Sequence, residues 1–383
     1  MKFGSVCSGI EAASVAWHPL GWEAAWLSEI EPFPCAVLKH HYPDVPNHGD
    51  MTLLPEKILS GEVEAPDLFC GGTPCQAFSV AGLRNSLDDA RGNLSLTFVG
   101  IANAIDHVRS VRRDAPAIIF WENVPGVLNT KDNAFGCFLG ALAGEVDQIV
   151  PPGDKWPNAG CVFGPKRTVA WRVLDAQYFG VAQRRRRVFV VASARDDFDP
   201  ASVLFEFEGV RRDIAPSREA GQRIAPCVTN DPPFSRTGNE RVEAEAMVVS
   251  MSSGQANAEI RSDGGASTLT CLHEAPIAAY AIQGNMIGRN DKAGPQGDGI
   301  NVELCFTQNT IDRHAVATPM AVRRLTPTEC ERLQGFPDGY TNIPWRKSAE
   351  SPDGPRYKAL GNSWAVPVVR WIGKRIQEAI NAA

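Results

Sequence analysis

Residues 66–79 contain a cysteine in a setting that suits nucleophilic chemistry. A short apolar run ends at two glycines, and Cys75 then follows between Pro74 and Gln76. An apolar strand that ends in glycines is typical of the carboxyl edge of a sheet, where α/β proteins bind ligands. Pro74 stiffens the loop because its ring fixes φ. Cys75 is therefore either a reactive thiol or one more buried cysteine in a chain that has ten.

Two further groups of polar residues lie beside apolar runs. Glu122 directly follows a run of strand type, where desolvation would raise its pKa and suit proton donation; capping of the next helix is the alternative. Residues 183–192 lead from four arginines into an apolar strand. Strand periodicity places Gln183, Arg185 and Arg187 on one face, so some guanidinium groups must enter the fold and need an acidic, phosphate or base-edge partner.

The first fifty residues predict the elements that would hold a nucleotide-like ligand. A strand over 2–7 leads through a glycine turn at Gly9 into a helix over about 10–17. The next apolar run ends at Glu29, 20 residues after Gly9, where this architecture places a ribose-binding carboxylate. Asp50 is placed similarly after the next helical segment. A surface glutamate and a turn residue are the alternatives for these two positions.

The middle of the chain has a different character. Residues 150–166 predict an irregular connection, and from about 194 to 320 Gly, Ser, Thr, Asn and Asp are abundant. Short β-type runs occur there at 246–250, 278–282 and 302–306. This composition indicates an inserted recognition domain rather than a catalytic one.

Ordered patterns return near the C-terminus. Thr326 caps a short predicted helix that ends before Gly335. The last helix carries an apolar stripe formed by Val366, Val369, Ile372, Ile376 and Ile380. Such a stripe has to dock on a core, so we expect this helix to pack on the N-terminal layer and the two chain ends to meet.

Composition limits the classes of protein that fit. The 383 residues carry a net charge of −6, with 44% hydrophobic and 21% charged residues, as in ordinary globular proteins. No segment approaches the roughly 20 apolar residues of a membrane span, and no secretion signal is evident. The cysteines form no CxxC pair, so neither a disulfide framework nor a metal site is expected. We expect a cytoplasmic protein in which any nucleic-acid binding uses a local basic surface.

Taken together, these segments resemble the cytosine-C5 DNA methyltransferase family across almost the whole chain. The matching segments are 3–12, 73–76, 122–124, 183–187, 323–337 and 361–363. The resemblance implies an α/β fold: a Rossmann-like S-adenosylmethionine-dependent methyltransferase sheet with helices on both faces, plus a smaller, mostly β or irregular target-recognition domain. It implies a catalytic domain at 1–193, a target-recognition domain at 194–345 and a C-terminal segment at 346–383 that returns to the catalytic domain.

The same resemblance implies a DNA (cytosine-5-)-methyltransferase. In that chemistry Cys75 adds to C6 of a flipped cytosine, and Glu122 hydrogen-bonds or protonates N3. Arg187, with Arg185, holds O2 or a nearby phosphate. Residues 79–93 would close over the extruded base.

The family also implies binding residues and partners. The cofactor-binding positions are Cys7, Ser8, Gly9, Ile10, Glu29, Ile30, Asp50, Met51, Pro74, Leu94, Asn362 and Ser363. The DNA-binding positions are Gln76, Ser79, Arg91, Gln183 and Thr307. The expected partner is double-stranded DNA, with a cognate restriction endonuclease as a genetic rather than physical partner, and the chain is expected to be a monomer. The chain departs from the family pattern at Cys7, Glu11, Ala12 and Trp364. The family usually has an aromatic residue at the position of Cys7 and valine at the position of Trp364.

Three other interpretations of the sequence stay open. The tRNA-methylating branch shares the cysteine and Glu-Asn-Val motifs, although a recognition region of over a hundred residues favours duplex DNA. An inactive DNA-binding relative would lack catalytic positions that are intact here. A thiol-dependent dehydrogenase would need a dinucleotide fingerprint that is absent.

Overall fold

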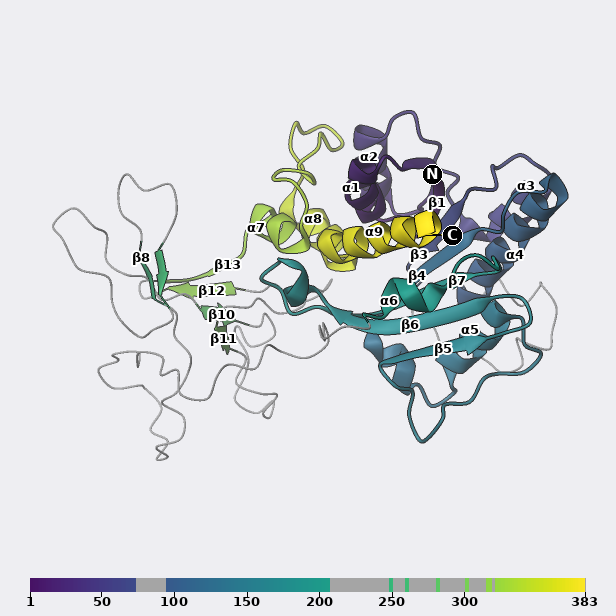
Figure 1. The fold of residues 1–383 in the computed structure, drawn as a ribbon. Helices are drawn as coiled ribbons and strands as arrows, with labels where there is room; N and C mark the ends of the chain where they lie inside the picture. Colours follow the sequence, from purple (N-terminus) through teal and green to yellow (C-terminus); the bar gives the residue numbers. More distant parts are fainter. Residues whose placement is uncertain are drawn as a thin grey trace.

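The computed structural model describes residues 1–73, 94–206 and 325–382, together with six short strands between 248 and 324 (Figure 1). The predictions for Pro74, Cys75, Gln76, Ser79, Arg91, Thr307 and the 79–93 loop lie outside the described residues.

A seven-stranded sheet forms the centre of the chain. Its strands are β1 (Lys2–Val6), β2 (Glu23–Ser28), β3 (Leu68–Gly71), β4 (Ile118–Asn123), β5 (Ala159–Phe163), β6 (Thr168–Asp175) and β7 (Arg186–Ser193). The spatial order is β2-β1-β3-β4-β7-β6-β5. The first four strands are parallel, whereas β7, β6 and β5 each run antiparallel to their neighbours.

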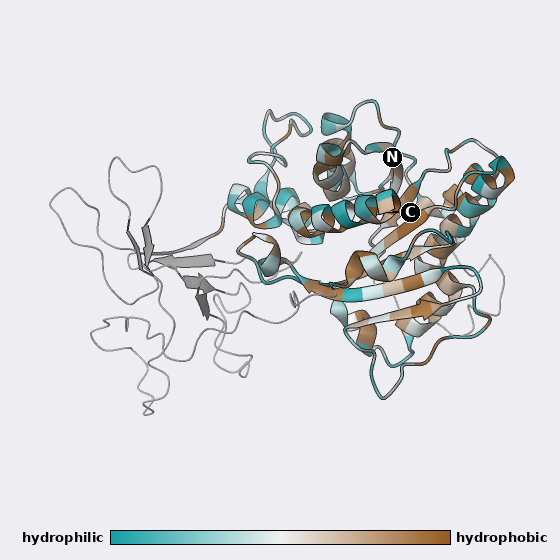
Figure 2. Cartoon of the chain, in the orientation of Figure 1, coloured by the Kyte–Doolittle hydropathy of each residue, from teal (hydrophilic) through white to brown (hydrophobic). Residues whose placement is uncertain are grey.

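Helices cover both faces of this sheet because its strands are apolar on both sides (Figure 1). Phe69 of β3 and Trp121 of β4 pack with α3 (Leu54–Leu59), α4 (Leu94–Arg112) and α5 (Ala134–Ala143). Cys70 and Phe120, one residue away in each strand, face the other layer, which contains α1 (Ala12–Trp17), α6 (Pro200–Leu204) and α9 (Val366–Ala382). In Figure 2, apolar residues are frequent on the strands of the sheet, whereas α9 carries both apolar and polar residues. The predicted fold class is confirmed.

The docking of α9 also agrees with the sequence. Val366, Val369, Ile372 and Ile376 are fully buried, and Ile380 packs at the margin of the same core. Trp17 Nε1 donates to the carbonyl of Val369 at 3.0 Å, and Trp22 Nε1 donates to Gln377 at 2.9 Å. Each buried aliphatic side chain contributes roughly 1.5–3 kcal/mol, so the stripe fastens the C-terminal helix to α1. The two termini consequently lie near each other (Figure 1).

Two predictions about local structure need correction. Residues 150–166 are not wholly irregular, because β5 forms an edge strand there; its residues are mostly half-exposed, so no apolar run revealed it. The strand expected from 183 begins only at Arg186. The predicted alternation nevertheless holds, since Gln183 and Arg185 are buried while Arg184 is exposed.

The region predicted to be β-rich contains six described strands. β8 (Val248–Ser250) pairs with β9 (Glu259–Arg261). β10 (Tyr280–Ile282), β11 (Ile300–Val302), β12 (Ala315–Thr318) and β13 (Ala321–Arg324) form an antiparallel sheet. The predicted runs 246–250 and 278–282 contain β8 and β10, whereas 302–306 touches β11 only at Val302. On either side of this region, Phe198 and Phe336 belong to the main core.

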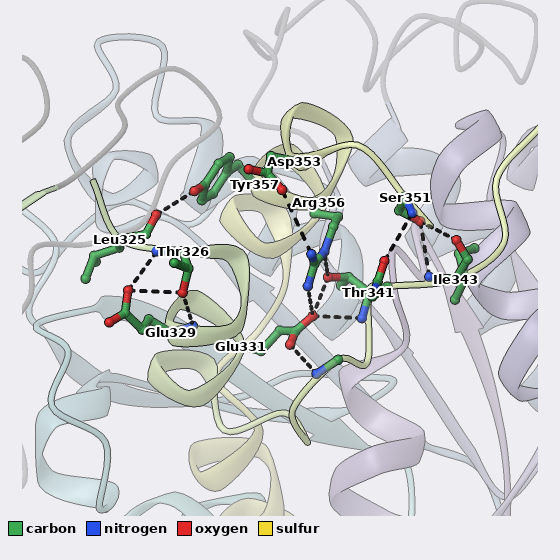
Figure 3. Close-up of polar contacts among 12 residues, drawn as sticks. Leu325, Thr326, Glu329, Glu331, Thr341, Ile343, Ser351, Asp353, Arg356 and Tyr357 are labelled. Atoms are coloured by element: carbon green, nitrogen blue, oxygen red, sulfur yellow. Dashed lines mark hydrogen bonds and ion pairs between the residues drawn. The ribbon is translucent and has the colours of Figure 1, made fainter. Parts of the chain in front are cut away.

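A buried polar network joins the two helices that precede α9 (Figure 3). Glu331 of α7 (Pro327–Gln334) accepts hydrogen bonds from the backbone N–H groups of Gly339 at 2.6 Å and Thr341 at 2.8 Å. Arg356 of α8 (Asp353–Asn362) pairs with Glu331 at 3.1 Å and donates to the Thr341 hydroxyl at 2.9 Å. The predicted ends of α7 are confirmed: Thr326 forms a capping box, and Gly335 adopts φ 81°. The network fixes α8 against α7.

Candidate active site

A cavity of about 810 Å³ opens at the carboxyl ends of the parallel strands. The position of the cavity follows from the sheet topology. β2 lies on one side of β1 and β3 on the other, so the connections leave the end of β1 in opposite directions. This reversal of strand order leaves a crevice there. The predicted site residues that line it are Cys7, Gly9, Glu29, Ile30, Asp50, Met51, Leu94, Glu122, Arg185, Arg187 and Asn362. The fold therefore collects residues from nearly the whole length of the sequence.

Three predicted cofactor positions do not line this cavity. Ser8 and Ser363, with Glu11 and Trp364, line an adjoining cavity of about 20 Å³, which shares Cys7, Gly9 and Asn362 with the larger one. Ile10 is fully buried in the core, and its carbonyl accepts a hydrogen bond from the Tyr340 hydroxyl at 2.9 Å.

The turn after β1 carries an unusual backbone. Cys7, Gly9 and Glu11 all have positive φ, at 49°, 56° and 64°. Alternating conformations of this kind can aim successive N–H groups at an anion. Here the Gly9 N–H donates to Oε2 of Glu29 at 2.8 Å, so the turn and the end of β2 hold each other in place.

The neighbouring wall of the cavity combines carboxylates with apolar side chains. Oε1 of Glu29 also accepts from the N–H groups of Ile30 and Glu31, and Asp50 caps the short helix Met51–Leu53. Ile30 is 71% exposed at the cavity wall. Burial raises the pKa of the Cys7 thiol to about 12, with a smaller contribution from Glu29, so the thiol stays neutral. A strand-end carboxylate beside apolar surface suits an adenosine group, which has ribose hydroxyls and a flat ring.

Glu122 forms the acidic centre of the opposite wall. Its Oε1 pairs with Nε of Arg187 at 2.9 Å, and the side chains are only 10% and 13% exposed. Burial raises the pKa of Glu122; Arg187, Arg185 and hydrogen bonds from Trp364 and Arg187 act in the opposite direction. Glu122 is thus a buried carboxyl that can hold a proton more readily than a surface glutamate.

Arg185 lines the same cavity but also has a bracing contact. Its Nη2 donates to the carbonyls of Ser363 at 2.7 Å and Gly361 at 3.2 Å, and its backbone N–H donates to Asp175 at 2.9 Å. It ties the start of β7 to the turn between α8 and α9. Gln183, predicted to contact DNA, is fully buried, and neither of its amide atoms has a hydrogen-bond partner in the described part of the chain.

Thr73 is the last described residue before the predicted nucleophile, and it is held from several sides. Asn123 Nδ2 donates to the carbonyl of Thr73 at 3.0 Å, and Trp121 Nε1 donates to its hydroxyl at 2.9 Å. The Ser95 hydroxyl lies 2.9 Å from the same oxygen. The chain therefore enters residues 74–75 from a fixed point on the cavity wall.

Sequence reasoning assigned no function to Thr73, Asn123 or Gly72, and noted Trp364 only as a departure. The Glu-Asn-Val motif contained the signal for Asn123. Nothing in the sequence pairs Trp364 with Glu122. Among the described residues, no cluster of three or more His, Cys, Asp or Glu side chains could hold a metal, and no helix is long and apolar enough to cross a membrane.

The fold and cavity define a class of protein: an α/β enzyme with a nucleotide-type site and a buried acid. The family model for the C-5 cytosine-specific DNA methylase matches residues 1–146 and 166–378. The chain belongs to that family. The predictions of family, fold class, enzyme class and S-adenosylmethionine as cofactor are confirmed, and DNA is the substrate that the family implies.

The individual proteins similar to this chain are methyltransferases, and the first is named for adenine, whereas the family model is for cytosine C5. The chain is 46% identical to the DNA N-6-adenine-methyltransferase of Escherichia phage P1, over 99% of this chain but only 61% of that protein. It is 26% identical to the Type II methyltransferase M.HpaII of Haemophilus parainfluenzae, over 99% of this chain and 89% of the relative. The crystal structure of S. pombe Dnmt2 methyltransferase shares the fold, with a TM-score of 0.53 and 16% identity over 100% of this chain and 99% of the other.

Proposed function

We propose that this chain methylates C5 of a cytosine within a specific sequence of duplex DNA, with Cys75 as the nucleophile. The observation that carries the proposal is the pairing of Glu122 with Arg187 in the cavity wall, beside the anchored Thr73. A carboxyl of raised pKa next to a guanidinium suits the N3 and O2 edge of a cytosine ring.

The reaction proceeds by temporary addition to the ring. The Cys75 thiolate forms a bond to C6, and electrons of the C5–C6 double bond move toward C5 as Glu122 gives a proton to N3. Arg187 holds Glu122 in place and stabilises charge at O2. When bound, S-adenosylmethionine supplies an electrophilic methyl group. Once C5 carries the methyl group, its proton passes to water and the N3 proton returns to Glu122. The C5–C6 double bond forms again as the Cys75 sulfur leaves with the electrons of its bond to C6.

The cofactor binds, in this proposal, along the wall formed by the ends of β1 and β2. Glu29 accepts from the ribose hydroxyls, Asp50 lies next to the adenine end, and Ile30 and Leu94 contact the ring. The other proposed contacts are Cys7, Ser8, Gly9, Met51, Pro74, Asn362 and Ser363; Ile10 is left out of the set because its side chain is fully buried in the core.

Within the recognition domain expected at 194–345, we assign target reading to residues 207–324, because the flanking segments 198–204 and 330–343 contribute to the catalytic core. Gln76, Ser79, Arg91 and Thr307 are proposed DNA contacts; Gln183 is left out of the set because its side chain is fully buried. The chain acts as a monomer, and its cognate endonuclease is a genetic partner.

Bisulfite sequencing of DNA from cells that express the chain tests the proposal. We expect 5-methylcytosine at one sequence context, and none with the matched Cys75→Ala variant. A wild-type protein that leaves every cytosine unmodified would contradict the proposed function.

The base and the nucleic acid can be checked in the same preparation. Mass spectrometry of nucleosides should find 5-methylcytosine in DNA, but neither N6-methyladenine in DNA nor 5-methylcytosine in tRNA. Duplexes that contain 5-fluorocytosine should become covalently trapped on the chain in the presence of the methyl donor. Methylated tRNA alone would support the tRNA-methylating branch instead.

A further inference from the structure

The half-buried indole of Trp364 lies in the turn between α8 and α9. Its ring packs edge-on against Phe120, with centroids 5.3 Å apart and planes at 76°. Phe120 precedes Glu122 by two residues in β4, so packing against this ring brings the indole to the end of the strand that carries the acid. Arg185 braces the same turn through the carbonyls of Gly361 and Ser363.

The indole nitrogen of Trp364 and the carboxyl of Glu122 lie over the same residue, Gly72. Donation from the indole lowers the pKa of Glu122. A Cβ atom at residue 72 would lie 2.9 Å from Trp364 Nε1 and 3.2 Å from Glu122 Oε2. Both atoms therefore border the bare backbone of Gly72, and any side chain there would press against them.

The two oxygens of Glu122 consequently have different partners. Oε1 receives the charged Nε of Arg187, whereas Oε2 lies on the side of Gly72, where the indole nitrogen also lies. An indole nitrogen can only donate. With a donor near each oxygen, the carboxyl group cannot rotate freely. A proton on Glu122 can then occupy only the lone-pair positions that face neither donor.

We propose that Trp364 is a positioning residue for the reaction, in that its indole N–H fixes the orientation of the Glu122 carboxyl that protonates cytosine N3. The inference rests on the proposed function for the role of Glu122, but the contact itself can be tested without turnover.

Trp364→Phe keeps most of the ring that packs on Phe120 and removes only the donor. Because the N–H favours the ionised form of Glu122, its loss should raise the titration midpoint of that carboxyl by about one pH unit. The measurement is carbon-13 NMR of the full chain with labelled glutamate carboxyls, with Glu122→Gln used to assign the resonance. Trp371→Phe is the matched control, because Trp371 is a half-buried indole that packs on Phe179 along α9.

The descending limb of the pH profile of kcat should move to higher pH in Trp364→Phe and stay in place in Trp371→Phe. A Glu122 titration that is the same in Trp364→Phe and in wild type would overturn the proposal, even if the melting temperature falls. Should Trp364→Phe fail to fold, Gly72→Ala displaces the indole from the other side and must raise the same midpoint. A wild-type chain without methylation would defeat the proposed function, whereas the NMR titration would still decide the Trp364 contact.

Discussion

Glu11→Gln should stabilise the chain above neutral pH. Glu11 is 1% exposed, and its Oε1 accepts from the backbone and hydroxyl of Ser14 at the start of α1. Burial raises its pKa from 4.5 to about 7. The folded state therefore binds the proton more tightly than the unfolded state, and stability falls as pH rises from 4.5 to 7. At about 1.36 kcal/mol per pH unit, ionisation of Glu11 costs roughly 3 kcal/mol above pH 7.

Glutamine has nearly the same shape but cannot ionise, so the difference in unfolding free energy between variant and wild type isolates this group. Urea unfolding at pH 5, 6, 7 and 8 should show the difference growing with pH towards about 3 kcal/mol. Glu56→Gln, at an exposed position of α3, is the control and should show no such growth. Parallel pH curves for Glu11→Gln and wild type would refute the assignment.

Three other substitutions test the remaining contacts. Arg356→Met leaves the fully buried Glu331 without its cation and should cost about 3 kcal/mol of unfolding free energy, part of which Glu331→Gln should restore. If the changes in unfolding free energy of Arg356→Met and Glu331→Gln, measured in urea, simply add in the double variant, the two side chains do not interact. Asn123→Ala removes the donor to the Thr73 carbonyl and should lower kcat about tenfold while calorimetric affinity for the cofactor product stays unchanged. A matching loss of that affinity would point to general disruption. Glu122→Gln should bind DNA in gel-shift assays but turn over about a hundredfold more slowly; unchanged turnover would remove Glu122 from the acid role.

The sequence predicted those parts of the fold in which local pattern and burial agree. The stripe of α9 has helical periodicity and is buried as expected, because a helix of this kind can only dock on a core. The same holds for Thr326 and Gly335, whose capping chemistry is local. The edge strand β5 was missed because an edge strand that is half-exposed carries no hydrophobic signature.

Side-chain direction within the site was harder to foresee. The alternation around Arg185 correctly predicted a buried guanidinium, but its contacts with the carbonyls of Gly361 and Ser363 depend on a segment 176 residues away. The contact between Trp364 and Glu122 likewise depends on how two distant segments meet over Gly72. Such contacts are set by the tertiary fold and leave no mark in the spacing of residues.

The cavity wall joins Cys7 and Gly9 to Asn362, which lie more than 350 residues apart. At a synthesis rate of 5–20 residues per second, the N-terminal half of this wall would emerge from the ribosome on the order of tens of seconds before the other half. The cavity wall is complete only after the end of α8 has folded back beside the turn that follows β1. A nascent chain that ends before α8 therefore has an incomplete cavity wall.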